Sequence, residues 1–121
     1  MLKMVFCCRR NPALTREEFQ RYWLEEHAAL VRSLRAAIPS VVRYVQSHTT
    51  INDPLNDAVR TSRGTLEAYD GITETWIDMS ATGSATPEES AEALRRLYED
   101  EAKFVDFANS SVFFTIEHEI Y

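Results

Sequence analysis

Residues Thr15 to Leu34 read T-R-E-E-F-Q-R-Y-W-L-E-E-H-A-A-L-V-R-S-L, and the interpretation of the whole chain starts from them. Glu18 stands three residues after Thr15, which is the spacing of a capping box at a helix N-terminus. Phe19, Trp23, His27, Leu30 and Leu34 recur at spacings of three and four, so they share one helix face that we expect to be buried. Four of these five residues are apolar and the middle one is an imidazole, which raises the question of why a titratable ring lies there.

Length and charge limit the classes of function. The chain has 121 residues, so we expect residues 1–121 to form a single domain. The formal net charge is -6 and no Lys/Arg cluster is present, which disfavours a nucleic-acid partner. Every apolar run is far shorter than the roughly 18 residues of a membrane helix, and the run at Met4 to Cys8 is too short for a signal sequence. These features predict a cytoplasmic protein without a membrane partner.

The two cysteines are adjacent in a predicted strand. Cys7 and Cys8 therefore point to opposite faces and are not expected to bond to each other. Two reduced, buried thiols in the cytoplasm are the ordinary interpretation.

Four strands and two helical regions follow from the pattern. The first strand, 2–9, is apolar on both sides, and the strand at 41–49 is rich in β-branched residues. Thr86, Pro87 and Glu89 open a second helix with a capping box, and Asp100 is expected to cap a further helical piece that ends near Asn109. The predicted strands are 2–9, 41–49, 69–79 and 111–121.

The order β-α-β-β-α-β predicts an α+β, ferredoxin-like fold: a four-stranded antiparallel sheet with two helices on one face. Helices on one face cannot cover both sides of the apolar first strand, so a second copy of the chain is expected against the other face, as in a homodimer. The segment 50–68 has turn chemistry and no clear period. It is either a lid over a pocket or a surface loop, with a short helical turn possible at 55–59.

Several segments together resemble the EthD family of the dimeric α/β-barrel superfamily. They are R-R-N-P-A-L-T-R-E-E-F-Q-R-Y-W-L-E-E-H ending at His27, Y-D-G-I-T-E-T-W-I-D at 69–78, E-D-E-A-K-F-V-D-F at 99–107, and Glu117-His118. The family usually has a proline soon after the histidine, whereas Ala28 and Ala29 follow here. The resemblance implies two half-barrels that join through their sheets into a dimeric α/β barrel. It also implies cofactor-free chemistry or binding of small organic molecules, since relatives include lactone isomerases and enzymes that cyclise, dehydrate or decarboxylate aromatic polyketides.

Six residues are candidates for the site. His27, Tyr44 and His118 are the candidate catalytic residues, because an imidazole transfers protons near neutral pH and a phenol can polarise a carbonyl. His27 could equally be a core histidine whose ring is satisfied by a carbonyl or carboxylate. Trp23, Glu74 and Trp76 are the candidate substrate-binding residues. Tryptophan offers a flat wall to a ring, but core packing is the simpler reading of Trp76, and Glu74 could instead form a cross-strand ion pair.

No cofactor or metal is expected. The three histidines show neither H-x-H nor H-E-x-x-H spacing, and no glycine-rich phosphate loop or G-x-S-x-G motif is present. Two hypotheses remain. The first is a cofactor-independent lyase or isomerase that acts by acid/base chemistry on a small aromatic, lactone or polyketide-like compound. The second is a non-catalytic protein of a degradation pathway that binds a small hydrophobic or aromatic molecule.

Overall fold

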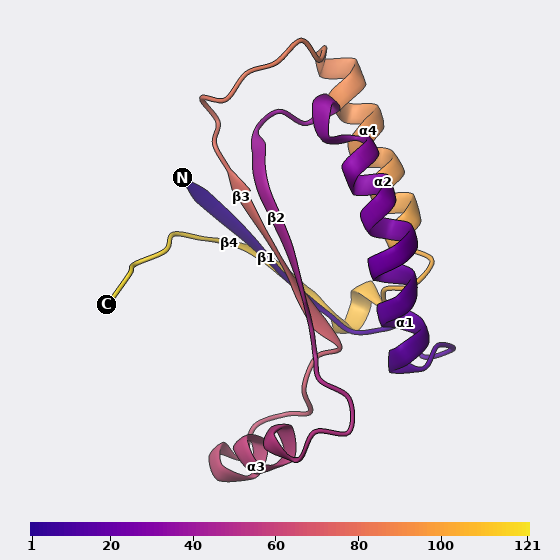
Figure 1. The fold of residues 1–121 in the computed structure, drawn as a ribbon, viewed down its shortest axis with the longest axis vertical. Coiled ribbons are helices and arrows are strands. Elements are labelled where there is room, and N and C mark those ends of the chain that lie inside the picture. The colour runs from indigo at the N-terminus through magenta and orange to yellow at the C-terminus, as the bar shows by residue number, and fades with distance from the viewer.

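A computed structural model describes all residues from 1 to 121 and shows one antiparallel sheet with helices on one face (Figure 1). The strand order is β2-β3-β1-β4, with β1 and β3 in the centre. This is the ferredoxin-like arrangement, so the predicted fold class is confirmed. The strands are β1 (Leu2–Cys8), β2 (Val41–His48), β3 (Gly71–Ile77) and β4 (Ser111–Thr115).

The first helical region begins with the predicted capping box. The amide of Glu18 donates to Thr15 Oγ1 at 3.1 Å, and the amide of Thr15 donates to Glu18 Oε1 at 2.9 Å. The region contains one feature that the pattern did not predict, a π-helical turn η1 (Trp23–His27) between α1 (Arg16–Tyr22) and α2 (Ala28–Ser33). Such turns add one residue to a helix and occur frequently at functional sites.

The second helix, α4 (Pro87–Glu101), lies beside α2 on the same face of the sheet (Figure 1). Its Thr86 capping box is present as predicted. The prediction that Asp100 caps a new helical piece was wrong, because α4 continues through Asp100 to Glu101 and only the short 3₁₀ turn η3 (Phe107–Asn109) follows. Asp100 is instead buried and binds side chains of the first helical region.

The segment 50–68 contains a regular helix, α3 (Pro54–Arg63), rather than an irregular loop. Asp53 caps its start by accepting the Leu55 amide, and Gly64 ends it in the left-handed conformation at φ 64°. Helix α3 lies beyond one end of the sheet, and the loop between β3 and α4 lies at the opposite end (Figure 1). Helix α3 has no buried residue.

Strand β4 is shorter than predicted and leaves much apolar surface uncovered. Thr115 is the last paired residue because it lies opposite Lys3, close to the beginning of β1, so the predicted extension to Tyr121 has almost no partner strand. The last residues run away from the sheet (Figure 1). Three neighbouring side chains of β4 are exposed: Val112 by 54%, Phe113 by 45% and Phe114 by 61%.

The core forms where the first helical region meets the sheet. Phe19 and Trp23 pack there with Cys8, Phe104 and Val105. Gly71 permits this packing, since a Cβ at that position would lie 2.4 Å from Trp23 Cζ3. Both cysteines are free, which confirms that they do not pair. No helix is long and apolar enough to cross a bilayer.

Candidate functional site

A cavity of about 630 Å³ lies between the helices and the sheet. This volume is within the usual range of small-molecule sites. Hydrophobic residues make up 17 of the 25 residues in its lining, so a ligand that fills it must be largely apolar. No residue of 50–68 contributes to the lining, and the structure therefore does not support the interpretation of that segment as a lid.

His27 lies at the end of the π-helical turn and lines the cavity, although only 4% of its surface is exposed. Its Nδ1 is 2.7 Å from Asp100 Oδ2. Asp100 also accepts a hydrogen bond from Tyr22 Oη at 2.6 Å and lies 3.3 Å from Lys103 Nζ. Because the Asp100 carboxylate accepts a hydrogen bond from Nδ1, that nitrogen carries the proton, and Nε2 keeps a free lone pair.

Burial lowers the pKa of His27, and this effect outweighs the opposing influence of the Asp100 hydrogen bond and charge. The imidazole is therefore neutral at pH 7. The pKa of Asp100 is lowered: burial acts to raise it, but the hydrogen bonds from Tyr22 and His27 prevail. A neutral imidazole held by an ionised carboxylate is the protonation state in which Nε2 can accept a proton.

Glu101 faces the free nitrogen. Its Oε2 lies 3.9 Å from His27 Nε2, too far for a hydrogen bond, and the carboxyl group also lines the cavity. Burial, with a smaller effect from the charge of Asp100, raises the pKa of Glu101 to about 7. A large fraction of Glu101 is thus protonated at neutral pH. The cavity therefore contains a proton acceptor, His27, and a proton donor, Glu101, because their surroundings shift the two pKa values in opposite directions.

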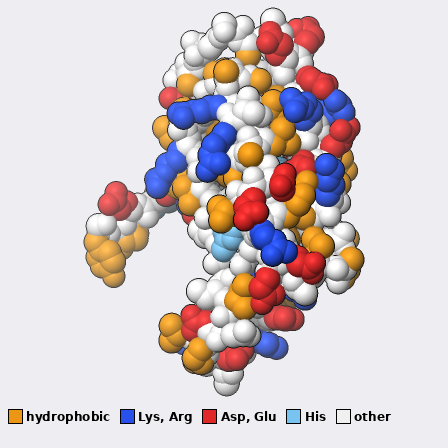
Figure 2. Space-filling model, turned by 45° about the vertical axis from the view of Figure 1, so that its right-hand side comes forward, with side chains coloured by type: hydrophobic (Ala, Val, Ile, Leu, Met, Phe, Trp, Pro, Cys, Tyr) orange, Lys and Arg blue, Asp and Glu red, His pale blue; other side chains and the backbone are white.

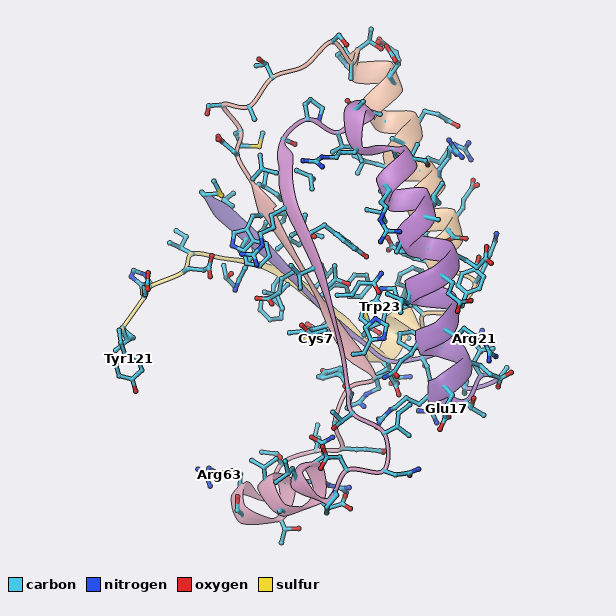
Figure 3. The ribbon with its side chains drawn as sticks, viewed as in Figure 1. Cys7, Glu17, Arg21, Trp23, Arg63 and Tyr121 are labelled. Atoms are coloured by element: carbon cyan, nitrogen blue, oxygen red, sulfur yellow. The ribbon has the colours of Figure 1, made fainter.

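Tyr44 lines the cavity from the sheet side. Its hydroxyl accepts a hydrogen bond from Gln46 Nε2 at 3.1 Å, and the same nitrogen lies 3.0 Å from the Trp23 carbonyl. That carbonyl also accepts the amide of Ala28, five residues on, across the π-helical turn. Burial raises the pKa of Tyr44, so its phenol stays protonated and can donate to a ligand. Trp23 points from the helix toward the sheet (Figure 3) and stacks on His48 at a centroid distance of 4.4 Å.

Comparison with known families places the chain. The sequence profile of the EthD domain matches residues 11–108, which is most of the 121 residues. The chain belongs to the EthD family. A sequence search of curated proteins finds no match.

Solved structures similar to this EthD chain share its fold at low identity. An EthD family protein from Bacillus halodurans is 16% identical with a TM-score of 0.58, and 98% of this chain aligns with 99% of that one. A dimeric ferredoxin-like protein of unknown function from Thermobifida fusca is 13% identical with a TM-score of 0.54, over 94% of this chain and 88% of that one. HapK from Hahella chejuensis is 11% identical with a TM-score of 0.53, over 100% and 98% of the two chains.

Three of the six predicted site residues of this EthD domain line the cavity, and three do not. Trp23, His27 and Tyr44 are in the lining. Glu74 and Trp76 lie on the opposite face of the sheet, because Thr73 and Thr75, which alternate with them along β3, face the cavity. His118 is exposed beyond the end of β4. The structure thus brings Trp23, His27 and Tyr44 together and places Glu74, Trp76 and His118 away from the cavity.

The outward-facing residues have other partners. Glu74 pairs with Lys3 at 2.7 Å. The Trp76 indole donates to Glu117 at 2.5 Å, and the charged groups of Lys3 and Arg43 lie over its ring. The cross-strand ion pair proposed for Glu74 is thus present. These residues lie on the face of the sheet opposite the cavity, and they do not line the space beside His27.

Asp100 and Glu101 are the residues that the sequence pattern failed to bring into the site. Both belong to the E-D-E-A-K-F segment that the EthD resemblance covers, but Asp100 was interpreted as a cap and Glu101 was given no role. The sequence did contain a signal, because Asp100 and Glu101 continue the buried face of the amphipathic helix α4. The sequence does not show that this face lies against His27. That contact depends on the packing of α4 on the first helical region.

The protonation of Glu101 predicts a specific dependence of stability on pH. Its folded pKa of about 7 lies above the ordinary glutamate value of 4.5, so the native state binds more protons than the unfolded state between these pH values. This contribution is fully present below the unfolded pKa and is lost as the pH rises through about 7. Glu101→Gln cannot ionise, and its melting temperature should fall less than that of the wild type between about pH 5 and pH 8. Thermal melts of both proteins across this pH range test the prediction, with Glu92→Gln at an exposed position as the control. Equal changes of melting temperature with pH in the wild type and Glu101→Gln would contradict it.

Proposed function

We propose that this EthD family protein is a cofactor-independent lyase or isomerase that acts by acid/base chemistry on a small aromatic, lactone or polyketide-like compound. The observation that carries the proposal is the His27–Asp100 pair, at 2.7 Å, whose free Nε2 faces Glu101 across an apolar cavity. A histidine that served only the core would need no second acid at its free nitrogen. Glu101 is partly buried and forms no hydrogen bond, which is unfavourable for a carboxyl group, so its place beside the imidazole supports a use in proton transfer.

The proposed reaction begins at a carbon acidified by a neighbouring carbonyl group. His27 Nε2 takes the proton from that carbon, and the Asp100 carboxylate stabilises the resulting imidazolium. Protonated Glu101 gives its proton to the carbonyl oxygen, which produces a neutral enol. Return of a proton from His27 to a different carbon completes an isomerisation, while the enol oxygen gives its proton back to Glu101 and the carbonyl group re-forms. In a lyase reaction, His27 instead protonates a β-hydroxyl group, which departs as water while the enol oxygen returns its proton to Glu101.

Exchange of hydrogen for deuterium from solvent tests this proposal without knowledge of the natural product. Small lactones and aromatic β-keto compounds are incubated with the protein in D₂O, and loss of the α-proton signal is followed by NMR. The proposal predicts exchange faster than in buffer for at least one class, with no added cofactor. Ligands that bind in the cavity with no acceleration of exchange would favour the alternative, a non-catalytic binding protein.

We also propose that the protein is a homodimer joined through the sheet faces that no helix covers. The half-buried Val5, Val45 and Ile72 and the 45% exposed Phe113 belong to this face. Covering it with a second copy removes apolar area from water. A related structure is described as a dimeric ferredoxin-like protein, which agrees with this assembly.

Light scattering should therefore give a mass of about 28 kDa, twice the 13.9 kDa of one chain. Phe113→Asp places a charge on the proposed interface and should shift the protein toward the monomer. Leu55→Asp, on the exposed helix α3, is the control and should not change the mass. A wild-type protein that stays monomeric at micromolar concentration would contradict the homodimer.

A further inference from the structure

The charged residues around the cavity are distributed unevenly. Trp23, His27 and Phe104 are buried at one part of the lining. At another part, near the end of α2 and the start of β2, the lining includes the exposed Arg32 and Arg35. The cavity thus has a closed apolar interior that contains the acid and the base, and an open end that carries basic side chains.

Neither arginine has an electrostatic partner within the protein. The side chains of Arg32 and Arg35 form no hydrogen bond and no ion pair, although the chain has 19 acidic residues and 13 basic ones. Arg43 also lines the cavity, but its guanidinium lies over the Trp76 ring at 4.4 Å and is therefore occupied. Figure 2 shows Lys and Arg side chains gathered next to hydrophobic ones on the upper part of the face that it draws. The two free guanidinium groups remain available to an anion.

The helix dipole gives one reason for basic residues here, since cations are favoured near a helix C-terminus. It does not explain why both side chains, although exposed, lie in the lining of the cavity. Arg21, two residues before η1 in the same helical region, points away from the sheet (Figure 3) and is absent from the lining. Arginine is well suited to a carboxylate, because its planar fork can form two parallel hydrogen bonds.

We propose that Arg32 and Arg35 bind the carboxylate of the substrate, so that the cavity selects small amphiphilic acids with an apolar, flat body and one anionic end. This inference rests on the proposed function, which makes the cavity the substrate site, and it names the substrate class. Arg32 and Arg35 follow His27 by five and eight residues. At 1.5 Å per residue, the backbone of Arg32 lies about 8 Å beyond that of His27 along α2, and Arg35 follows in a short 3₁₀ turn (Arg35–Ala37). A one- or two-ring aromatic acid, or an acyl chain of similar length, spans this distance.

Isothermal titration with a pair of probes of equal shape tests the proposal. The probes are 2-naphthoate and the neutral 2-naphthamide, and the variants are Arg32→Gln, Arg35→Gln, the double variant and the control Arg21→Gln. We expect the wild type to bind the acid roughly tenfold or more tightly than the amide at low salt. The double variant should bind the acid as weakly as the amide, with its affinity for the amide unchanged, and Arg21→Gln should behave as the wild type. Raising the ionic strength from about 0.01 M to 1 M should narrow the preference, since the Debye length falls from about 30 Å to 3 Å.

Three results would overturn the proposal: equal affinity of the wild type for the two probes, equal weakening of both probes in the double variant, or no binding of either probe. These outcomes are distinct from those of the deuterium-exchange experiment. Tighter binding of the acid without deuterium exchange would support the anion site and contradict the acid/base function. Deuterium exchange without tighter binding of the acid would support the acid/base function and contradict the anion site.

Discussion

Replacement of His27 by glutamine should lower the rate of solvent exchange and the turnover of the true substrate by roughly 10²–10⁴-fold, the usual contribution of acid/base assistance. Glutamine can keep a hydrogen bond to Asp100, which His27 Nδ1 makes at 2.7 Å, but it cannot accept and return a proton near neutral pH. The variant should therefore fold, keep the mass of the wild type and melt close to it. The measurements are the exchange rate by NMR and a thermal melt on the same preparation.

Variants of the groups around His27 make the prediction sharper. Asp100→Asn removes the charge that stabilises the imidazolium and should also reduce the rate strongly. Tyr22→Phe removes only one of the hydrogen bonds to Asp100, at 2.6 Å, and should cause a smaller loss. If His27→Gln is destabilised while its folded fraction keeps full activity, the histidine is structural. Tyr44, which also lines the cavity, would then become the leading candidate.

The pH dependence of the rate follows from the same two groups. The reaction needs neutral His27 and protonated Glu101. Burial lowers the pKa of His27, so the rate should rise with pH in the acidic range, at pH values below the usual pKa of histidine. It should fall again as the pH passes about 7, where Glu101 ionises. Glu101→Gln should remove that second limb of the profile, and an unchanged profile would exclude Glu101 as the proton donor.

The fold was predictable from the sequence because local signals agreed with one another. The two capping boxes at Thr15 and Thr86 marked the helix starts, and β-branched or apolar runs marked the strands. Departures arose where a neighbour determines the structure. Strand β4 ends at Thr115 because its partner β1 begins at Leu2, and a single-strand pattern contains no information about the length of its partner.

The candidate site was predictable only in part, for a related reason. The 3.6-residue period placed His27 on a buried face, but His27 and Asp100 are 73 residues apart, and their pairing depends on how two separate helices pack together. Strand alternation places Glu74 and Trp76 on one face of β3 and Thr73 and Thr75 on the other, but it does not show which face meets the helices. Trp76 and Ile72 made one side appear to be the core side, whereas the cavity side carries the smaller Gly71, Thr73 and Thr75. Small residues are needed there because Trp23 fills the space above Gly71.

Replacement of Asp70 by alanine should have the largest effect on stability. The Asp70 side chain is 3% exposed and binds three donors from two other segments: the Arg10 amide at 2.7 Å, Arg10 Nη1 at 3.0 Å and Arg16 Nε at 2.8 Å. It thereby joins the beginning of β3 to the segment after β1 and to the start of α1. Removing one partner of a buried pair costs about 3–5 kcal/mol. We expect a loss of about 3 kcal/mol, because both guanidinium groups keep some contact with water.

The pH dependence distinguishes this anchor from a packing defect. Burial acts to raise the pKa of Asp70, but the hydrogen bonds from Arg10 and Arg16 prevail and lower it below 3.8. A depressed folded pKa stabilises the protein above the unfolded pKa, and the contribution is lost as the pH falls through the folded value. Urea unfolding should therefore show a constant difference between wild type and Asp70→Ala above about pH 5 that shrinks in acid. Asp78→Ala, whose carboxylate binds only Ser80 in exposed hydrogen bonds, should cost much less. A difference for Asp70→Ala that is equally large at about pH 2 would mean that lost packing, and not the charge, holds these segments together.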